Sequence, residues 1–277
     1  MAQKIDLSCW QDFEKEIEKI AVNHQTDKRL IRRLLYRGQS DANWRLQTTL
    51  ERHLKTELSL ADYLRTIASL QSEIETFTQN RWDVPEYTEL SNSFSNYELF
   101  HNSPVLYKIY GYMAHLRHHG FPSPLLDWTR SARVAAYFAF AGAEHSERVS
   151  IYVLSEARMH TGGGKEPEIR SLGPNVKTHR RHFLQQCEYT MCARFENSQW
   201  WFADHDAAFE SRNESEDPPI NFANYHFTFP GSERLKVLEM LDRDNVNAFS
   251  LFGSEESLME TLALREFHFP NPYFGNQ

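Results

Sequence analysis

Residues 125–141 read LLDWTRSARVAAYFAFA. This stretch places a carboxylate, an indole and a hydroxyl directly before a run of small and apolar residues. Within that run the larger apolar side chains recur at spacings of three and four, at Val134, Tyr137, Phe138 and Ala141. Because residues at these spacings share one face of a helix, the run predicts an amphipathic helix.

The three residues before this helix have both a structural and a functional interpretation. Either Asp127 or Thr129 can cap the helix, because a carboxylate or a hydroxyl accepts hydrogen bonds from its unpaired N–H groups. Capping does not explain Trp128, which lies between them. A helix N-terminus also carries a partial positive charge, which suits an anionic ligand. Capping and ligand binding both remain open here.

The rest of the chain mixes helical and strand-like patterns. Helical spacing of apolar residues covers residues 10–24, 60–79, 106–120, 233–246 and 255–267. Strand-like patterns cover residues 34–38, 148–156, 182–196 and 224–230. Helices come early and strands then mix with helices, which favours an α+β fold. No composition shift marks a domain boundary, so we expect one domain over residues 1–277 with an N-terminal helix.

Composition and charge exclude some classes of protein. The formal net charge of −8 over 277 residues argues against sequence-independent binding of duplex nucleic acid, which depends on phosphate neutralisation. The cysteines Cys9, Cys187 and Cys192 are odd in number and lack a scaffold spacing, which indicates a reducing compartment. No segment approaches the roughly 20 apolar residues of a membrane span. We therefore expect a cytoplasmic protein without a membrane partner.

The segment Tyr36-Arg37-Gly38 places an arginine at the end of an expected strand. The planar fork of a guanidinium suits a phosphate or a carboxylate. A surface arginine before a turn is the alternative, and the segment alone does not exclude it.

The segment QQCEYT, residues 185–190, follows a strand-like alternation. Gln186 and Glu188 are two apart, so a strand would present both on one face. Such a pair can hydrogen-bond a sugar hydroxyl and stabilise positive charge that develops nearby. A solvated strand face is the alternative. The same alternation puts Gln185 on the face opposite to Glu188.

Three histidines lie near the end of the helix expected over residues 106–120. They are His115, His118 and His119. Their spacing matches no recognised metal motif with neighbouring cysteines or carboxylates. The sequence therefore predicts no metal site.

Together these segments resemble the FRG domain family. The resemblance is carried by YRGQSDANW, by RHHGFPSPLLDWTRSARVAAYFAFA, and by LKVLEMLDRDNVNAFSLF near the end. A further segment, RHFLQQCEY, supplies Arg181, Gln185 and Tyr189, with Cys187 where a glycine is usual in the family. The resemblance covers roughly residues 30–260. It does not by itself imply an activity.

A weaker resemblance is to the ADP-ribosyltransferases, which order three similar elements along the chain. They have a strand with Arg, a motif that enters a helix of small residues, and a strand with Glu. Here these are Tyr36-Arg37-Gly38, Asp127-Trp128-Thr129 and Gln186-Cys187-Glu188. The resemblance implies an α+β fold with a mixed or antiparallel β core and flanking helices, and NAD as substrate.

The second resemblance also implies residue roles. Glu188 would offset the positive charge that develops when the bond between nicotinamide and ribose breaks. Arg37, in its strand motif with Tyr36 and Gly38, would bind the NAD diphosphate or an adjacent ribose, and Thr129 would orient Arg37 or the strand. Independently of the resemblance, a carboxylate beside an arginine suggests that Asp127 fixes Arg37 through an ion pair. Trp128 or Tyr137 would stack on nicotinamide, and His118 would hold the adenosine ribose. If Gln185 faces the cleft in place of Glu188, the catalytic role passes to Gln185 or to Asp127.

Three functional hypotheses follow. The first is an NAD-consuming ADP-ribosyltransferase or glycohydrolase, such as a toxin or antiphage effector, with a protein or a nucleic acid as acceptor. The second is a non-catalytic module that senses NAD or another nucleotide. The third is a nucleic-acid-binding protein whose arginines contact phosphates, namely Arg32, Arg33, Arg37 and Arg45.

Overall fold

We analysed a computed structural model of the chain. The structure describes the backbone of residues 2–25, 33–86, 88–90, 94, 103–156, 167–211 and 224–269. The side chains of residues 22–25, 33, 156 and 211 are outside this description. So is Arg32, one of the arginines predicted to contact phosphates.

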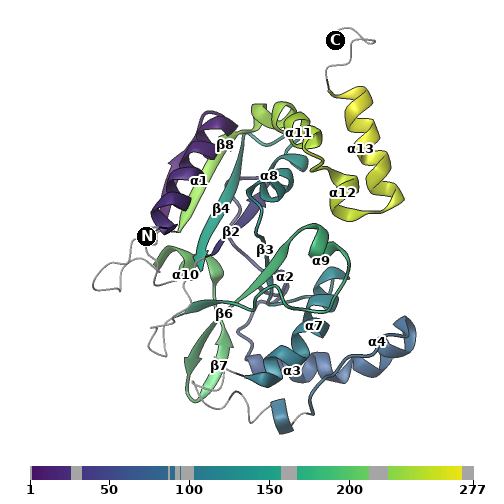
Figure 1. Cartoon of the computed structure of the whole chain (residues 1–277). Helices are drawn as coiled ribbons and strands as arrows, with labels where there is room; N and C mark the ends of the chain where they lie inside the picture. Colours follow the sequence, from purple (N-terminus) through teal and green to yellow (C-terminus); the bar gives the residue numbers. More distant parts are fainter. Residues whose placement is uncertain are drawn as a thin grey trace.

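A mixed β-sheet forms the centre of the molecule (Figure 1). Its described strands are β1 (Gln3–Asp6), β2 (Arg33–Gln39), β3 (Leu126–Thr129), β4 (Arg148–Glu156), β5 (Glu168–Ser171), β6 (Cys187–Glu196), β7 (Gln199–Phe202) and β8 (Tyr225–Pro230). The strand order is β1-β8-β4-β2-β3-β6-β5, and β7 pairs with β6. The β1/β8 pair is parallel and the other pairs are antiparallel.

Helices flank this sheet, so the predicted α+β class and the mixed, mostly antiparallel sheet are confirmed. The described helices are α1 (Trp10–Gln25), α2 (Thr49–His53), α3 (Leu60–Ser69), α4 (Gln71–Thr78), α7 (Pro104–His118), α8 (Ala132–Ala141), α9 (Arg181–Leu184), α10 (His205–Ser211), α11 (Arg234–Arg243), α12 (Ala248–Phe252) and α13 (Glu255–Phe267), with a 3₁₀ turn at Gly231–Glu233. None of the described helices is long and apolar enough to cross a membrane.

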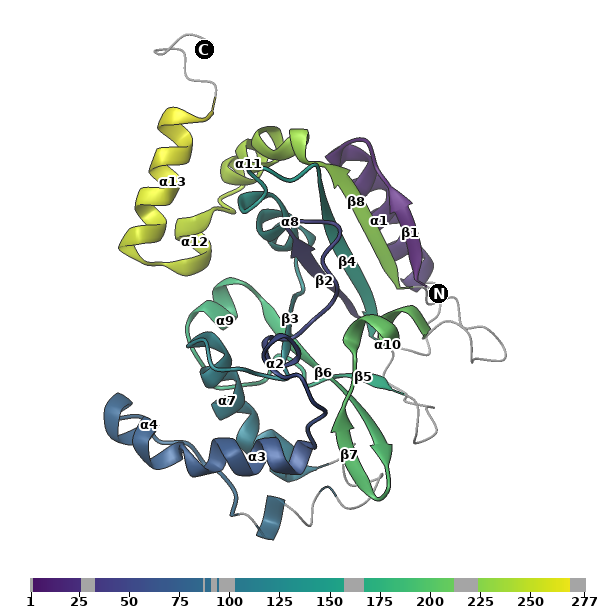
Figure 2. The ribbon, with the colours of Figure 1, turned by 180° about the vertical axis from the view of Figure 1, so that it is seen from behind.

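Two large apolar clusters hold the helices on the sheet. One joins α1, α8 and α11 to β2, β4 and β8, and it contains Phe13, Phe140 and Phe227. The other joins α3 and α7 to β6, and it contains Tyr63 and Tyr112. Figure 2 shows the same division from behind, with α1, α8 and α11 at one end of the sheet and α3 and α7 at the other.

The motif of small residues in α8 is explained by how closely this helix approaches β2. A Cβ atom added to Gly38 would lie 1.9 Å from the carbonyl oxygen of Ala135 and 2.6 Å from the backbone nitrogen of Ala139. No side chain fits in that space, and larger residues on α8 would hold the helix away. The Tyr36-Arg37-Gly38 strand and the small-residue helix are therefore two halves of one packing contact.

The stretch Leu126–Thr129 forms strand β3, so the prediction that Asp127 or Thr129 caps the next helix was wrong. The residues stay extended because β3 pairs with β6 over its whole length, with Leu126 opposite Thr190. The helix begins later, at Ala132, and Ser131 caps it by accepting a hydrogen bond from the Val134 N–H.

The predicted strand over residues 182–196 begins five residues late. Arg181–Leu184 is a short helix, and Gln185 and Gln186 form the turn that follows it. Gln186 has φ of +48°, a left-handed conformation that breaks the strand alternation, and β6 starts at Cys187. The strand alternation that put Gln185 and Glu188 on opposite faces therefore does not apply, because Gln185 lies outside the strand.

Candidate functional site

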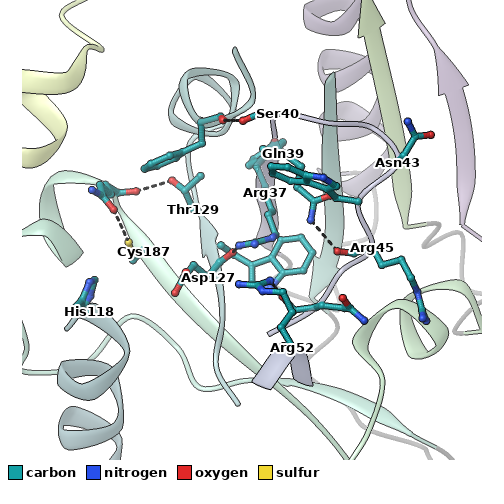
Figure 3. Close-up of a pocket in the computed structure, with 17 residues that line it drawn as sticks. Arg37, Gln39, Ser40, Asn43, Arg45, Arg52, His118, Asp127, Thr129 and Cys187 are labelled. Carbon is teal, nitrogen blue, oxygen red and sulfur yellow. Dashed lines mark hydrogen bonds between the residues drawn. The ribbon is translucent and has the colours of Figure 1, made fainter. Parts of the chain in front are cut away.

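A cavity of about 730 Å³ opens where β2 and β3 diverge. The two strands share a single register pair, Tyr36 with Thr129. Beyond it, β2 continues into the segment 40–48 while β3 leads into α8. The cavity is lined by the end of β2, by this segment, by β3 and by the start of β6 (Figure 3).

Arg37 extends from β2 into the centre of the cavity. In Figure 3 it lies between Asp127 and Thr129 on one side and Asn43 and Arg45 on the other. Its Nη1 donates to the backbone carbonyl of Asp127 at 2.8 Å. Its Nε is buried and donates to no group that the structure describes.

Arg37 is half-buried and remains charged. Desolvation lowers the pKa of its guanidinium to about 10, and the positive charges of Arg117 and Arg52 act in the same direction, whereas Asp127 opposes them. Burial without a carboxylate partner is costly for a guanidinium. An anion in the cavity would relieve that cost.

Asp127 supplies the carboxylate of the cavity, as no other lining residue in the described part of the chain is acidic. Arg117 holds it in a fork, with Nη2–Oδ2 at 2.5 Å and Nε–Oδ1 at 3.3 Å. The predicted ion pair between Asp127 and Arg37 was therefore wrong, since Arg37 contacts the backbone of Asp127 and Arg117 takes its carboxylate. The Asp127 side chain is 36% exposed, so it is still accessible from the cavity.

The charge of the cavity is positive on balance. Arg52 also lines it and donates to the backbone carbonyl of Gln47, and no described carboxylate pairs with it. Since Arg117 offsets Asp127, the charges of Arg37 and Arg52 are left over. Paired guanidiniums of this kind suit phosphate groups.

The segment between β2 and α2 forms one wall and carries an exposed aromatic ring. Trp44 lines the cavity and its side chain is 57% exposed. Arg45 forms ion pairs with Asp204, which directly precedes α10, at 2.5 Å and with Asp206, in the first turn of α10, at 3.2 Å. Gln39 donates its Nε2 to the carbonyl of Arg45 at 3.2 Å. This wall therefore has a fixed position.

His118 lies at the opposite end of the cavity (Figure 3). Its Nε2 is 2.7 Å from the hydroxyl of the buried Tyr189. Burial lowers the pKa of His118 to about 4, so its imidazole is neutral at physiological pH. A neutral imidazole can donate a hydrogen bond to a ligand or accept one from it, but it brings no charge to the cavity.

Gln185 lines the cavity, and its contacts join three parts of the chain. Its carbonyl accepts from the Thr129 hydroxyl at 2.7 Å, and its Nε2 donates to the carbonyl of Leu251 at 3.2 Å. The Cys187 thiol lies 3.7 Å from its Oε1, and burial raises the pKa of that thiol to about 12. Cys187 is thus a neutral wall residue rather than a nucleophile.

Glu188 does not line the cavity. It is fully buried, pairs in register with Trp128, and accepts from the Ser171 hydroxyl at 3.3 Å. Its carboxylate also lies 4.0 Å from Nε of Arg130. Strand alternation puts Glu188 and Cys187 on opposite faces of β6, and it is Cys187 that reaches the cavity.

Two aromatic residues predicted to stack on nicotinamide have other partners. Trp128 is a lining residue, but its indole is almost fully buried and donates to the Thr190 hydroxyl at 2.8 Å. Tyr137 does not line the cavity and its hydroxyl is 3.3 Å from a carboxylate oxygen of Glu260. Its neighbour Phe138 lines the cavity in its place.

All three residues of the Tyr36-Arg37-Gly38 motif line the cavity. Tyr36 lines it and is otherwise buried, which raises the pKa of its phenol to about 12. Gly38 brings the backbone of β2 to the cavity next to α8. The structure therefore brings together most of the predicted residues: Tyr36, Arg37, Gly38, His118, Asp127, Trp128, Thr129 and Gln185.

Sequence reasoning missed the contribution of the segment after β2. The lining residues that it did not single out as site residues include Gln39, Ser40, Asn43, Trp44, Gln47 and Arg52. A signal was present, because the motif YRGQSDANW extends to Trp44 and an exposed tryptophan beside a polar turn is typical of binding sites.

Of the four arginines in the nucleic-acid hypothesis, the structure describes the side chains of Arg37 and Arg45. Arg37 points into the cavity, and Arg45 is neutralised by its two aspartates. Within the described ranges, no group of three histidine, cysteine or acidic side chains is placed to hold a metal ion.

Comparisons with known proteins give one match. The family model of the FRG domain matches residues 32–148. No curated protein and no solved structure matches the chain. The matched segment includes Arg37, Asp127 and Thr129 but not Gln185 or Cys187, and the predicted extent of one domain over residues 1–277 stays a prediction. The match therefore supports the resemblance to the FRG domain over residues 32–148.

Proposed function

We propose that the cavity binds NAD. The observation that carries this proposal is the pair of guanidiniums, Arg37 and Arg52, that line the cavity without a carboxylate partner among the described residues. Two uncompensated positive charges match the two negative charges of a dinucleotide diphosphate. A volume of about 730 Å³ is within the range of cofactor sites.

The shape of the site supports a ligand with two different ends. In Figure 3 Arg37 lies centrally, with Asn43 and Arg45 on one side and His118 and Asp127 on the other. Trp44 lines the cavity and lies between Asn43 and Arg45 in the chain. A dinucleotide has the same order of groups: a ring, a diphosphate, and a second ring on its ribose. A mononucleotide would leave one end unfilled.

We further propose that bound NAD is cleaved between nicotinamide and ribose. The bond from the ribose C1′ to the ring nitrogen breaks, and its electron pair leaves with nicotinamide. Asp127 would stabilise the positive charge left on the ribose, since it is the carboxylate of the cavity. Water or an acceptor nucleophile then bonds to C1′ and loses a proton, giving a glycohydrolase or an ADP-ribosyltransferase. Depletion of NAD would make such an enzyme a toxin or an antiphage effector.

A second candidate is a module that binds NAD without turning it over. It is favoured by the fork between Arg117 and Asp127, which offsets the charge that cleavage needs, and by the absence of Glu188 from the cavity lining. The two candidates share the binding step and differ only in the release of nicotinamide.

The test measures NAD binding by calorimetry and nicotinamide release by chromatography, on the same preparations. We expect Arg37→Ala to lose binding and release together, and Asp127→Asn to keep binding within a few-fold while losing release. Arg243→Ala, on the exposed side of α11, serves as the control arginine.

Binding without release by the wild-type protein, even with candidate acceptors present, would leave the sensor. No binding by a folded wild-type protein would refute both candidates. Full activity in Asp127→Asn would remove the role given to this carboxylate.

A further inference from the structure

Gln39 carries a buried acceptor without a donor at the Trp44 end of the cavity. The residue is 5% exposed and lines the cavity. Its Oε1 is buried and receives no hydrogen bond from any residue that the structure describes. Leaving a buried amide oxygen unpaired costs free energy, so the site gains when a ligand supplies a donor.

The orientation of the Gln39 amide is fixed by its other atom. Its Nε2 donates to the carbonyl of Arg45, which has no hydrogen to offer in return. Exchanging the two ends would set an oxygen against that carbonyl and lose the bond. The Arg45 side chain is held by Asp204 and Asp206, so its carbonyl stays in place beside Nε2 of Gln39. The unpaired atom of the Gln39 amide is therefore its oxygen Oε1, which can accept a hydrogen bond.

The same end of the cavity offers a stacking surface. Trp44 is exposed and lines the cavity, and its backbone carbonyl accepts from the Tyr152 hydroxyl at 3.2 Å. The ring therefore has an anchored backbone and an uncovered surface. An exposed indole near a polar acceptor suits a heteroaromatic ring with a donor on its edge.

We infer that the Trp44 end is a subsite for an aminopurine, with Gln39 as the residue that reads its exocyclic amino group. This inference rests on the proposed binding of NAD and specifies which half lies where. Arg37 holds the diphosphate, so the adenine stacks on Trp44 and donates its amino hydrogen to Gln39 Oε1. The nicotinamide half then lies towards Asp127 and His118.

The discriminating ligand pair is ADP-ribose and its hypoxanthine counterpart, inosine diphosphate ribose. In the second ligand a carbonyl oxygen, which cannot donate to Oε1, replaces the exocyclic amino group, and the adjacent N1 carries a hydrogen. We expect the wild-type protein to bind ADP-ribose about tenfold more tightly by calorimetry, the scale of one hydrogen bond with an unpaired group left behind. Nicotinamide mononucleotide lacks the aminopurine and should bind still more weakly.

Two variants locate the preference. Gln39→Leu removes the acceptor with little change of volume, and we expect it to bind both diphosphate riboses with similar affinity. Trp44→Ala should weaken both but leave binding of nicotinamide mononucleotide unchanged. Gln199→Leu, at an exposed position of β7 outside the cavity lining, is the matched control for a glutamine-to-leucine change.

The outcomes separate this inference from the proposal beneath it. Equal binding of the two diphosphate riboses by the wild-type protein, or an unchanged preference in Gln39→Leu, would overturn the aminopurine subsite while NAD binding stands. No binding of NAD or of any of these ligands by the folded protein would overturn both. If Trp44→Ala weakens the binding of nicotinamide mononucleotide most, the nicotinamide half lies at the Trp44 end and the assignment is wrong.

Discussion

Arg117 binds both carboxylate oxygens of Asp127 through one guanidinium. The arginine comes from the last turn of α7 and the aspartate from β3, so this fork joins a helix to the middle of the sheet. It also fixes the direction of the acidic group in the cavity. The consequence can be measured as a change in the free energy of unfolding.

Arg117→Met should lower the free energy of unfolding by about 1–2 kcal/mol, because it leaves a partly exposed carboxylate without its partner. The value is below that of a fully buried pair since Asp127 is 36% exposed. Urea unfolding at neutral pH measures the change. Arg243→Met, whose arginine is exposed on α11, should stay within about 0.5 kcal/mol of the wild type. Equal loss in both variants would contradict a specific role for the fork.

Gly38→Ala should destabilise the protein by about 3 kcal/mol or more, or prevent folding, because its Cβ would meet the backbone of α8. The nearest atom, the carbonyl oxygen of Ala135, would lie 1.9 Å away. Gly120→Ala is the contrasting variant: nothing lies within 4 Å of its added Cβ, and its φ of +85° costs only about 1–2 kcal/mol of backbone strain. Thermal unfolding of the two variants should rank them in that order. A mild effect at Gly38 would mean that α8 moves away easily.

Asp206→Ala should weaken NAD binding about three- to tenfold without unfolding the protein. Asp206 accepts from Arg45 Nε and from the Leu46 N–H, both at 3.2 Å, and so holds the wall that carries Trp44. Calorimetry measures the affinity and circular dichroism checks the fold. Asp244→Ala removes an exposed ion pair with Arg133 outside the cavity lining and should leave the affinity unchanged. An unaffected affinity in Asp206→Ala would show that Trp44 keeps its place by other contacts.

Stability should fall as the pH drops from about 6.5 to about 4, and His118 should contribute to the fall. Burial lowers its pKa from 6.5 to about 4 in the folded protein. Between these values the unfolded chain binds a proton that the folded chain does not, so acid favours unfolding. Above about pH 6.5 both states are neutral at this residue and the contribution vanishes.

The measurement is the urea midpoint at several pH values for the wild type and for His118→Gln. The variant should show a shallower fall over that range. It should not abolish the fall, because burial also lowers the pKa of His115, His179, His182 and His226. An identical slope in the variant would contradict the burial of a neutral His118.

Much of the fold was predictable because its signals are local. Apolar spacing predicted the helices. The close contact between Gly38 and α8 was not predicted, because it joins segments about 100 residues apart in the chain. β3 was missed because a buried strand of four residues has no periodicity, and its Asp and Thr also suit a helix cap. Its extended form comes from pairing with β6, sixty residues away in the chain.

The predicted site failed where contacts depend on register and on backbone conformation. The resemblance to the ADP-ribosyltransferases implied a cleft role for Glu188, but β6 begins after the left-handed Gln186 and it is Cys187 that lines the cavity. The partner of Asp127 was misjudged because Arg37 and Arg117 both lie nearby, and only the packing of α7 decides between them. No single-sequence pattern carries that information.

The position at which the family match ends has a practical consequence for work with a fragment of this chain. The family match ends at residue 148, where β4 begins, and β4 is the strand that pairs with β2 along its whole length. A fragment cut at that boundary would keep Arg37 and Asp127 but lose both neighbours that hold them in place, β4 on one side and β6 on the other. The segment that the family model matches is therefore shorter than the part of the chain that forms the cavity.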